Sequence, residues 1–170
     1  MNTHFRLTSI LVGPVLLALA IAGSAGAAED TARATGTVVA PIQITKTADL
    51  VFGSFAAGES TGTVTISTLG ARGKTGGVAL IGDAGAAAAF DVTGEGGLTY
   101  SIDLTTTPLT RDGGTETMSF TVESDITSGT LAGSGSAGAQ SFFVGGVLTV
   151  GAGQVPGTYE GTVKATVAYN

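Results

Sequence analysis

The last fourteen residues of the chain read Gly157-Thr158-Tyr159-Glu160-Gly161-Thr162-Val163-Lys164-Ala165-Thr166-Val167-Ala168-Tyr169-Asn170, and this stretch decides the fold. Every second position is apolar, aromatic or glycine, and the positions between are mostly polar. The first set comprises Tyr159, Gly161, Val163, Ala165, Val167 and Tyr169. Because successive side chains of a strand point to opposite faces of a sheet, the pattern predicts one half-buried strand over residues 158–169.

Residues 1–27 have the pattern of a secretory signal peptide. Residues 1–6 are positively charged, residues 7–23 are mainly apolar with Pro14 among them, and Ala25-Gly26-Ala27 is a small-residue cleavage site. The apolar run is too short for a spanning helix, and no stop-transfer charge cluster follows it. We therefore expect an exported protein that begins near Ala28, without membrane insertion once the signal is removed. A retained membrane anchor is the alternative interpretation.

The composition of residues 28–170 limits what the protein can bind. This part has no His, Cys or Trp, and thirteen acidic residues outnumber six basic ones. An acidic chain without basic clusters argues against nucleic acid and anionic lipid as partners. Without Cys there are no disulfides, so packing and strand pairing must hold the fold together. About 143 residues suit a single domain with one core.

Short apolar or alternating runs recur between Gly, Asp and Ser, which predicts an all-β protein. Strands are expected near residues 35–46, 49–55, 62–68, 77–82, 87–93, 98–105, 117–124, 141–150 and 158–169. Their spacing is typical of an antiparallel sandwich or barrel. Two glycine-rich segments, 69–77 and 128–138, are expected to be loops. Five phenylalanines lie in the strand-like runs and are expected in the core: Phe52, Phe55, Phe90, Phe120 and Phe142.

The same residues lack most catalytic groups. Without an imidazole, Ser–His–Asp and Cys–His mechanisms are excluded, and so are metal sites built on His or Cys. Catalysis by a pair of carboxylates, as in glycosidases, is not excluded by the composition. Its candidates are Asp91, Glu95, Asp103, Asp112, Glu116, Glu123 and Asp125. Most of them fall at turns or on the polar side of strands, where acidic side chains are solvated. We expect no enzyme activity, no metal and no cofactor.

A second alternating segment begins shortly after the signal peptide. Its apolar or small positions are Ala32, Ala34, Gly36, Val38, Ala40, Ile42 and Ile44. Because proline cannot donate to a ladder, Pro41 leaves either one long strand or two strands divided there. The plain interpretation is the first strand of the domain. The alternative is that residues 30–38 leave their own domain and pair with a neighbour, whose backbone Gly36 would allow to approach closely.

Several segments carry a resemblance to exported bacterial proteins. They are residues 37–46, 49–55, 90–94, 143–151 and 156–169. Together they resemble the secreted family catalogued as domain of unknown function 4402, and they are similar to chaperone–usher pilins, including the archaic, spore coat U type of subunit. The resemblance covers nearly all of residues 28–170.

The pilin resemblance implies an immunoglobulin-like antiparallel β-sandwich at residues 39–170 that lacks its final strand. A periplasmic chaperone would lend a strand to the open groove, and the N-terminal extension of the next subunit would replace it at an outer-membrane usher. The implied donor positions, in the extension 28–38, are Ala32, Ala34, Gly36 and Val38. The implied pairing positions of the C-terminal strand are Gly157, Tyr159, Val163, Ala165, Val167 and Tyr169.

The expected function is therefore that of an exported structural subunit of a fimbria-like surface fibre, with adhesion or biofilm formation as its role. Its partners would be the chaperone, the usher and neighbouring copies of itself. The alternative is a secreted or surface carbohydrate-binding module with a complete sandwich, although the chain has few aromatic residues to stack on sugars. A third hypothesis is an exported glycan hydrolase that uses Asp91 and Asp103.

Overall fold

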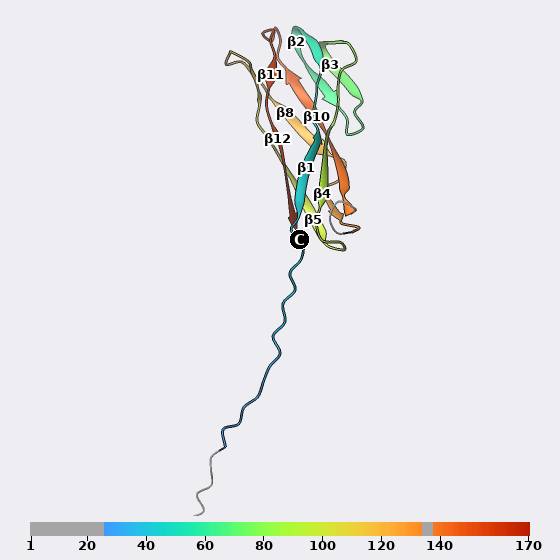
Figure 1. The fold of residues 1–170 in the computed structure, drawn as a ribbon. Coiled ribbons are helices and arrows are strands. Elements are labelled where there is room, and N and C mark those ends of the chain that lie inside the picture. Colours follow the sequence, from blue (N-terminus) through green and yellow to red (C-terminus); the bar gives the residue numbers. More distant parts are fainter. Residues whose placement is uncertain (1–25, 134–137) are drawn as a thin grey trace, which may run out of the picture. The chain divides into compact units, whose positions relative to one another are not determined.

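The computed structural model describes residues 26–133 and 138–170 (Figure 1). It divides the chain into two units, Met1–Gly36 and Thr37–Asn170. The described part of the first unit, residues 26–36, is exposed and has no regular secondary structure. The second unit is an antiparallel β-sandwich, which confirms the predicted all-β class. The signal-peptide prediction rests almost entirely on residues 1–25, which lie outside the described residues.

The described residues of the sandwich form twelve strands. They are β1 (Gln43–Ala48), β2 (Ser54–Ile66), β3 (Arg72–Ile81), β4 (Ala88–Thr93), β5 (Thr99–Thr106), β6 (Leu109–Arg111), β7 (Thr117–Met118), β8 (Phe120–Ser124), β9 (Ser128–Thr130), β10 (Gln140–Val150), β11 (Tyr159–Glu160) and β12 (Val163–Tyr169). No helix in the described part of the chain has the length and apolar character needed to cross a membrane.

The long strand β10 organises the first sheet, whose order is β1-β4-β10-β2-β3. Its first residues, from Gln140 to Val144, pair with β4, and its last, from Gly146 to Val150, pair with β2. Strand β8 pairs with the middle of β10. This strand can serve three partners because it is eleven residues long and has two backbone edges, and its alternate residues Phe142, Val144, Leu148 and Val150 are fully buried. The predicted strand at 141–150 is confirmed.

The second layer consists of two short sheets, β12-β5-β9 and β11-β6-β7. They meet where two facing segments are interrupted together, at residues 107–108 between β5 and β6 and at residues 161–162 between β11 and β12. Pro108 has no N–H for a ladder. The Thr107 amide donates to the Thr162 carbonyl at 3.0 Å and joins the two parts. The single strand predicted over 158–169 is therefore wrong in extent, because it is two strands.

Within β12 the predicted alternation is confirmed. Val163, Ala165, Val167 and Tyr169 are half-buried, while Lys164, Thr166 and Ala168 are exposed. All seven residues pair with β5, from Val163 opposite Thr106 to Tyr169 opposite Tyr100. In Figure 1, β12 runs beside β1, which is the last strand of the first sheet.

Other predicted boundaries are corrected by the structure. The strand expected at 35–46 begins only at Gln43, because residues 35–39 are exposed without a strand partner in the described part of the chain and Pro41 lacks a donor. Of residues 49–53, expected in a strand, only Val51 forms a bridge, to Ala86. The expected loop at 69–77 is largely strand, since residues 72–76 pair with β2. In the expected loop at 128–138, residues 128–130 form β9, and residues 134–137 lie outside the described part.

The core between the layers consists of two clusters. The first contains Phe52, Val64, Ile66, Val78, Met118, Phe120, Leu148 and Val150, and the second contains Ala88, Phe90, Val92, Tyr100, Leu131, Phe142 and Val144. Phe52 and Phe120 meet edge to face at 5.8 Å, and Phe90 stacks on Phe142 at 5.2 Å. The prediction of a core position is confirmed for these four phenylalanines. The fifth, Phe55, is only half-buried at the edge of the first cluster.

Candidate functional site

A groove of about 1070 Å³ opens along one side of the sandwich, between the edges of the two layers. One wall is formed by residues 46 and 48–57, which run from the end of β1 into β2. The other wall is formed by residues 154–163, which lead through β11 into β12. The floor consists of side chains from the core: Phe52, Ala88, Phe90, Leu109, Met118, Phe120 and Leu148.

The groove reaches the core itself. Among the buried core residues the three that keep the most solvent exposure are Phe52 at 8%, Phe120 at 8% and Phe90 at 7%, and all three line this groove. Core residues of β10 that lie away from the groove, such as Phe142 and Val144, have no solvent exposure. The walls add exposed apolar groups, because Val51 is 42% and Val155 is 40% exposed. An apolar ligand would therefore extend the core.

The strands along the groove are edge strands. β1 ends the first sheet, and β11 and β12 end the two sheets of the second layer. In β2, residues 54–57 pair with β3, while pairing with β10 begins only at Gly62. Each of these segments therefore has one backbone edge without a strand partner among the described residues. Unpaired edges of this kind are templates for a further strand.

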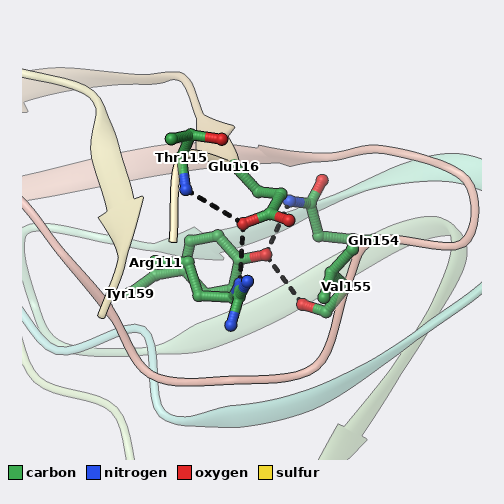
Figure 2. Close-up of polar contacts among 6 residues, drawn as sticks. All are labelled: Arg111, Thr115, Glu116, Gln154, Val155 and Tyr159. Carbon is green, nitrogen blue, oxygen red and sulfur yellow. Dashed lines mark hydrogen bonds and ion pairs between the residues drawn. The ribbon is translucent and has the colours of Figure 1, made fainter. Parts of the chain in front are cut away.

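A hydrogen-bond network shapes the wall of residues 154–159 (Figure 2). The Tyr159 hydroxyl donates to the Val155 carbonyl at 2.7 Å and accepts from Gln154 Nε2 at 2.9 Å. The Asp112 amide donates to the Thr158 carbonyl at 2.8 Å, which attaches this wall to the β6–β7 hairpin. These contacts hold the wall together, and Gln154 and Tyr159, which make them, also line the groove.

The β6–β7 hairpin behind this wall is held by an ion pair. Arg111 Nε donates to Glu116 Oε2 at 2.7 Å, and the Thr115 amide donates to the same oxygen at 3.2 Å (Figure 2). The hydrogen bond from Arg111 is the main reason why the pKa of Glu116 falls to about 2, with backbone donors adding to it. The turn that closes the hairpin has Gly113 at a φ of 67°, a conformation that favours glycine.

The opposite wall is positioned by Arg72 and Gly53. Arg72 Nη2 donates to the Ser54 carbonyl at 2.6 Å, and its Nη1 donates to the Gly82 carbonyl at 3.1 Å. Gly53 has a φ of 72°, and a Cβ there would overlap the carbonyl oxygen of Ala84. Glycine is therefore required at the point where the chain enters β2, and the wall depends on it.

The structure brings only part of the predicted C-terminal set to the groove. Tyr159 and Val163 line it, and Gly157 also lines it but lies in a bend before β11, which corrects its assignment to the strand. Ala165, Val167 and Tyr169 pack on the second core cluster instead. Their side chains point into their own domain, so a chain that pairs with β12 would contact its backbone edge.

The predicted donor positions Ala32, Ala34, Gly36 and Val38 are all exposed, and Val38 is 99% exposed. The sequence did not identify the floor residues Met118 and Leu148 or the wall at 48–57 as part of a site. In the sequence these residues are apolar like any other core residue. The groove cannot be recognised there, because it depends on where the edges of the two layers lie in space.

Asp91 and Asp103, the pair named for hydrolysis, lie on different sheets, whereas Glu123 and Asp125 of the candidate set line one depression on the first sheet. Asp91 is on β4 and accepts a hydrogen bond from Ser141 Oγ at 2.6 Å, whereas Asp103 is exposed on β5 in the other layer. Across residues 26–133 and 138–170, no three His, Cys, Asp or Glu residues lie close enough to hold a metal ion.

Comparison with known proteins gives one finding. No curated protein and no solved structure has a significant match to the chain. The model of the family described as "Domain of unknown function (DUF4402)" matches residues 42–169, from the residue before β1 to the end of β12. This match covers most of the chain and nearly all of the sandwich, and the chain therefore belongs to the DUF4402 family.

Proposed function

We propose that this chain is a structural subunit of an exported surface fibre, in which the groove of one copy takes a strand from the next. The observation that carries the proposal is the groove between residues 46–57 and 154–163, because it joins an apolar floor to unpaired backbone edges. Those are the two features that strand addition uses: main-chain hydrogen bonds supply affinity, and alternate side chains supply specificity.

The proposed occupant is the segment 30–38 of a second copy. Its alternate residues Ala32, Ala34, Gly36 and Val38 are apolar or small, and the segment is exposed in the free chain. From Ala32 to Val38 it would span about 20 Å as a strand, at about 3.3 Å per residue.

A second copy fits better than the same molecule. The segment joins the sandwich at Ala40, which Tyr169 holds at the end of β12 far from the groove. Between that point and the groove, Ile42 just before β1, Ile44 of β1 and Val167 of β12 pack on the second core cluster. A segment that folded back would have to displace this packing, whereas a segment from a neighbour enters an open groove.

The proposal includes a chaperone. Before assembly the edges of β11 and β12 and the apolar floor would be a site of aggregation, so a periplasmic chaperone would cover them and an outer-membrane usher would exchange it for the next subunit. The signal-peptide pattern of residues 1–27 motivates this part, together with the resemblance to chaperone–usher pilins inferred from the sequence alone.

Paired substitutions on the two faces of the segment test the proposal. Ala34→Asp puts a charge on the face that would enter the groove, and Thr35→Asp puts the same charge on the opposite face. Both residues are exposed in the free chain, so neither change should affect folding. In cells that also produce the chaperone and usher, electron microscopy should show fibres for the native chain and Thr35→Asp, and none for Ala34→Asp. Equal fibres from both variants, or no fibres from the native chain, would contradict the proposal.

A peptide measurement tests the groove without fibres. A chain that lacks residues 28–38 should be stabilised by a synthetic peptide of residues 28–40, by about 2.7 kcal/mol at a hundredfold excess over its dissociation constant. The same peptide with Ala34→Asp should have no effect. The melting temperature of the truncated chain with and without each peptide measures this.

A further inference from the structure

A second depression, of about 470 Å³, lies on the opposite side of the first sheet from the core. It is lined by residues 65–68 at the end of β2, residues 121–125 of and after β8, and residues 145–147 of β10. It shares no lining residue with the groove between the layers. Its size falls within the range of about 300–1,000 Å³ that is usual for small-molecule sites.

The depression borders the point where β2 stops pairing with β10, beside a glycine. Gly145 pairs with Glu123 of β8, and a Cβ on Gly145 would collide with the backbone of residues 66–68. The neighbours of Gly145 on the same face of β10 are Phe143 and Val147, two residues before and after it. Both are exposed, Phe143 by 42% and Val147 by 38%.

The lining is rich in hydroxyl and carboxylate groups. Hydroxyl-bearing residues of the lining are Thr65, Ser67, Thr68 and Thr121, and carboxylates come from Glu123 and Asp125, while the Ser124 hydroxyl donates to the Ile126 carbonyl. Asp125 is held in place, because its Oδ1 accepts the Phe143 amide at 2.8 Å. Lys and Arg are absent from the lining residues, so an anionic ligand would meet repulsion without compensation.

We propose that this depression binds a neutral sugar residue of a surface glycan. Sugar hydroxyls both donate and accept hydrogen bonds, which matches carboxylates that only accept and threonine hydroxyls that do both. Glu123, opposite the glycine, is the proposed acceptor for a pair of sugar hydroxyls. The apolar face of the sugar ring would lie on Val147, which lines the depression and is 38% exposed.

This inference goes beyond the proposed fibre function. Because the depression is on the outer face of the sheet, a strand in the groove would leave it open. Repeated along a fibre, a weak site of this kind would gain avidity without any new contact.

The test is a titration of the full chain, as purified and unassembled, with glucose, galactose, mannose and N-acetylglucosamine, followed by amide NMR. At least one sugar should shift signals of residues 65–68, 121–125 and 143–147 and leave residues that line the groove unchanged. Glu123→Gln should weaken that binding about tenfold, as expected for loss of a charge-assisted hydrogen bond. Glu160→Gln, on the groove wall, is the matched control and should bind normally.

Two outcomes would overturn the inference: no shift at these residues with any of the four sugars, or equal binding by Glu123→Gln and the native chain. Thr121→Val offers a second variant at the same site should Glu123→Gln fail to fold, and its binding must also be weaker. Because the titration uses unassembled protein, its result is independent of whether fibres form.

Discussion

The Tyr169 hydroxyl donates a hydrogen bond to the Ala40 carbonyl at 3.0 Å, and so joins the end of the last strand to the start of the sandwich. The same hydroxyl accepts the Glu95 amide at 2.6 Å. Glu95 completes the arrangement, because its carboxylate accepts the Ala40 amide at 3.2 Å. A single side chain near the C-terminus thus fixes the point where the N-terminal segment leaves the domain.

Removing this hydroxyl should loosen that end of the sandwich. Tyr169→Phe loses two hydrogen bonds and leaves part-buried backbone groups unpaired, so it should lower the free energy of unfolding by about 1–3 kcal/mol. Amide hydrogen exchange at residues 40–44 should become faster. Tyr159→Phe, which removes a hydroxyl from the groove wall, is the control and should leave exchange at residues 40–44 unchanged. Equal exchange in native chain and Tyr169→Phe would contradict the role given to this contact.

Two adjacent phenylalanines should respond very differently to truncation. Phe142 is fully buried and stacks on Phe90, whereas Phe143 points to the outer face and is 42% exposed. Phe142→Ala should therefore cost about 3–5 kcal/mol, since it leaves a cavity in the core. Phe143→Ala should change stability by no more than about 0.5 kcal/mol. Urea denaturation of the two variants measures both values, and similar losses would show that the register of β10 is wrong.

The Glu116–Arg111 pair should make stability depend on pH in acid. The pKa of Glu116 is about 2 in the folded chain, below its ordinary value of 4.5, so the ionised form favours folding. This contribution is complete above about pH 4.5 and is lost as the pH falls towards 2. Because the side chains are 26% and 34% exposed, salt should reduce it.

The measurement is the difference in unfolding free energy between the native chain and Glu116→Gln. It should shrink between pH 4.5 and 2 and should be smaller at high salt. A carboxyl titration of Glu116 by NMR with a midpoint at its ordinary value would contradict the prediction.

Alanine substitutions at two glycines with positive φ should distinguish the cost of backbone strain from the cost of a steric collision. At Gly70, with a φ of 80°, a Cβ would meet open space, so Gly70→Ala should cost about 1 kcal/mol from strain alone. At Gly53, with a φ of 72°, a Cβ would also overlap the Ala84 carbonyl. Gly53→Ala should therefore be clearly more destabilising in thermal unfolding. Equal melting temperatures for the two variants would mean that the chain around Gly53 can move aside.

The strand pattern could be read from the sequence where each strand has one buried face. Burial alternates at every position of residues 163–169, and polarity alternates at all of them except the small Ala168. This pattern is the reason why β12 could be predicted. The break before it was not predicted, because Gly161 fits the alternation. It follows from Pro108 on the facing segment, which interrupts the ladder at the same level.

Long-range pairing explains the other differences. Residues 72–77 look like a loop by composition, yet Thr75 pairs with Thr63 and the two hydroxyls lie 2.7 Å apart. Residues 35–40 look like a strand, yet they have no neighbouring strand in the described part of the chain to pair with. The groove was beyond prediction from single residues, since Phe52 and Phe120 carry an ordinary core signal. Their solvent exposure depends on how far apart the edges of the two layers lie, and this distance cannot be read from the sequence.

The contact between Tyr169 and Ala40 also has a mechanical meaning. A pull on the N-terminal segment would reach the domain at Ala40, next to the end of β12, whose seven residues are paired with β5. If the far end of the domain were anchored through β11, the tension would pass covalently from Ala40 into β1, which pairs with β4. The rungs of the β1–β4 ladder would then be sheared together instead of being unzipped one by one, and a molecule loaded in this direction should yield only at high force.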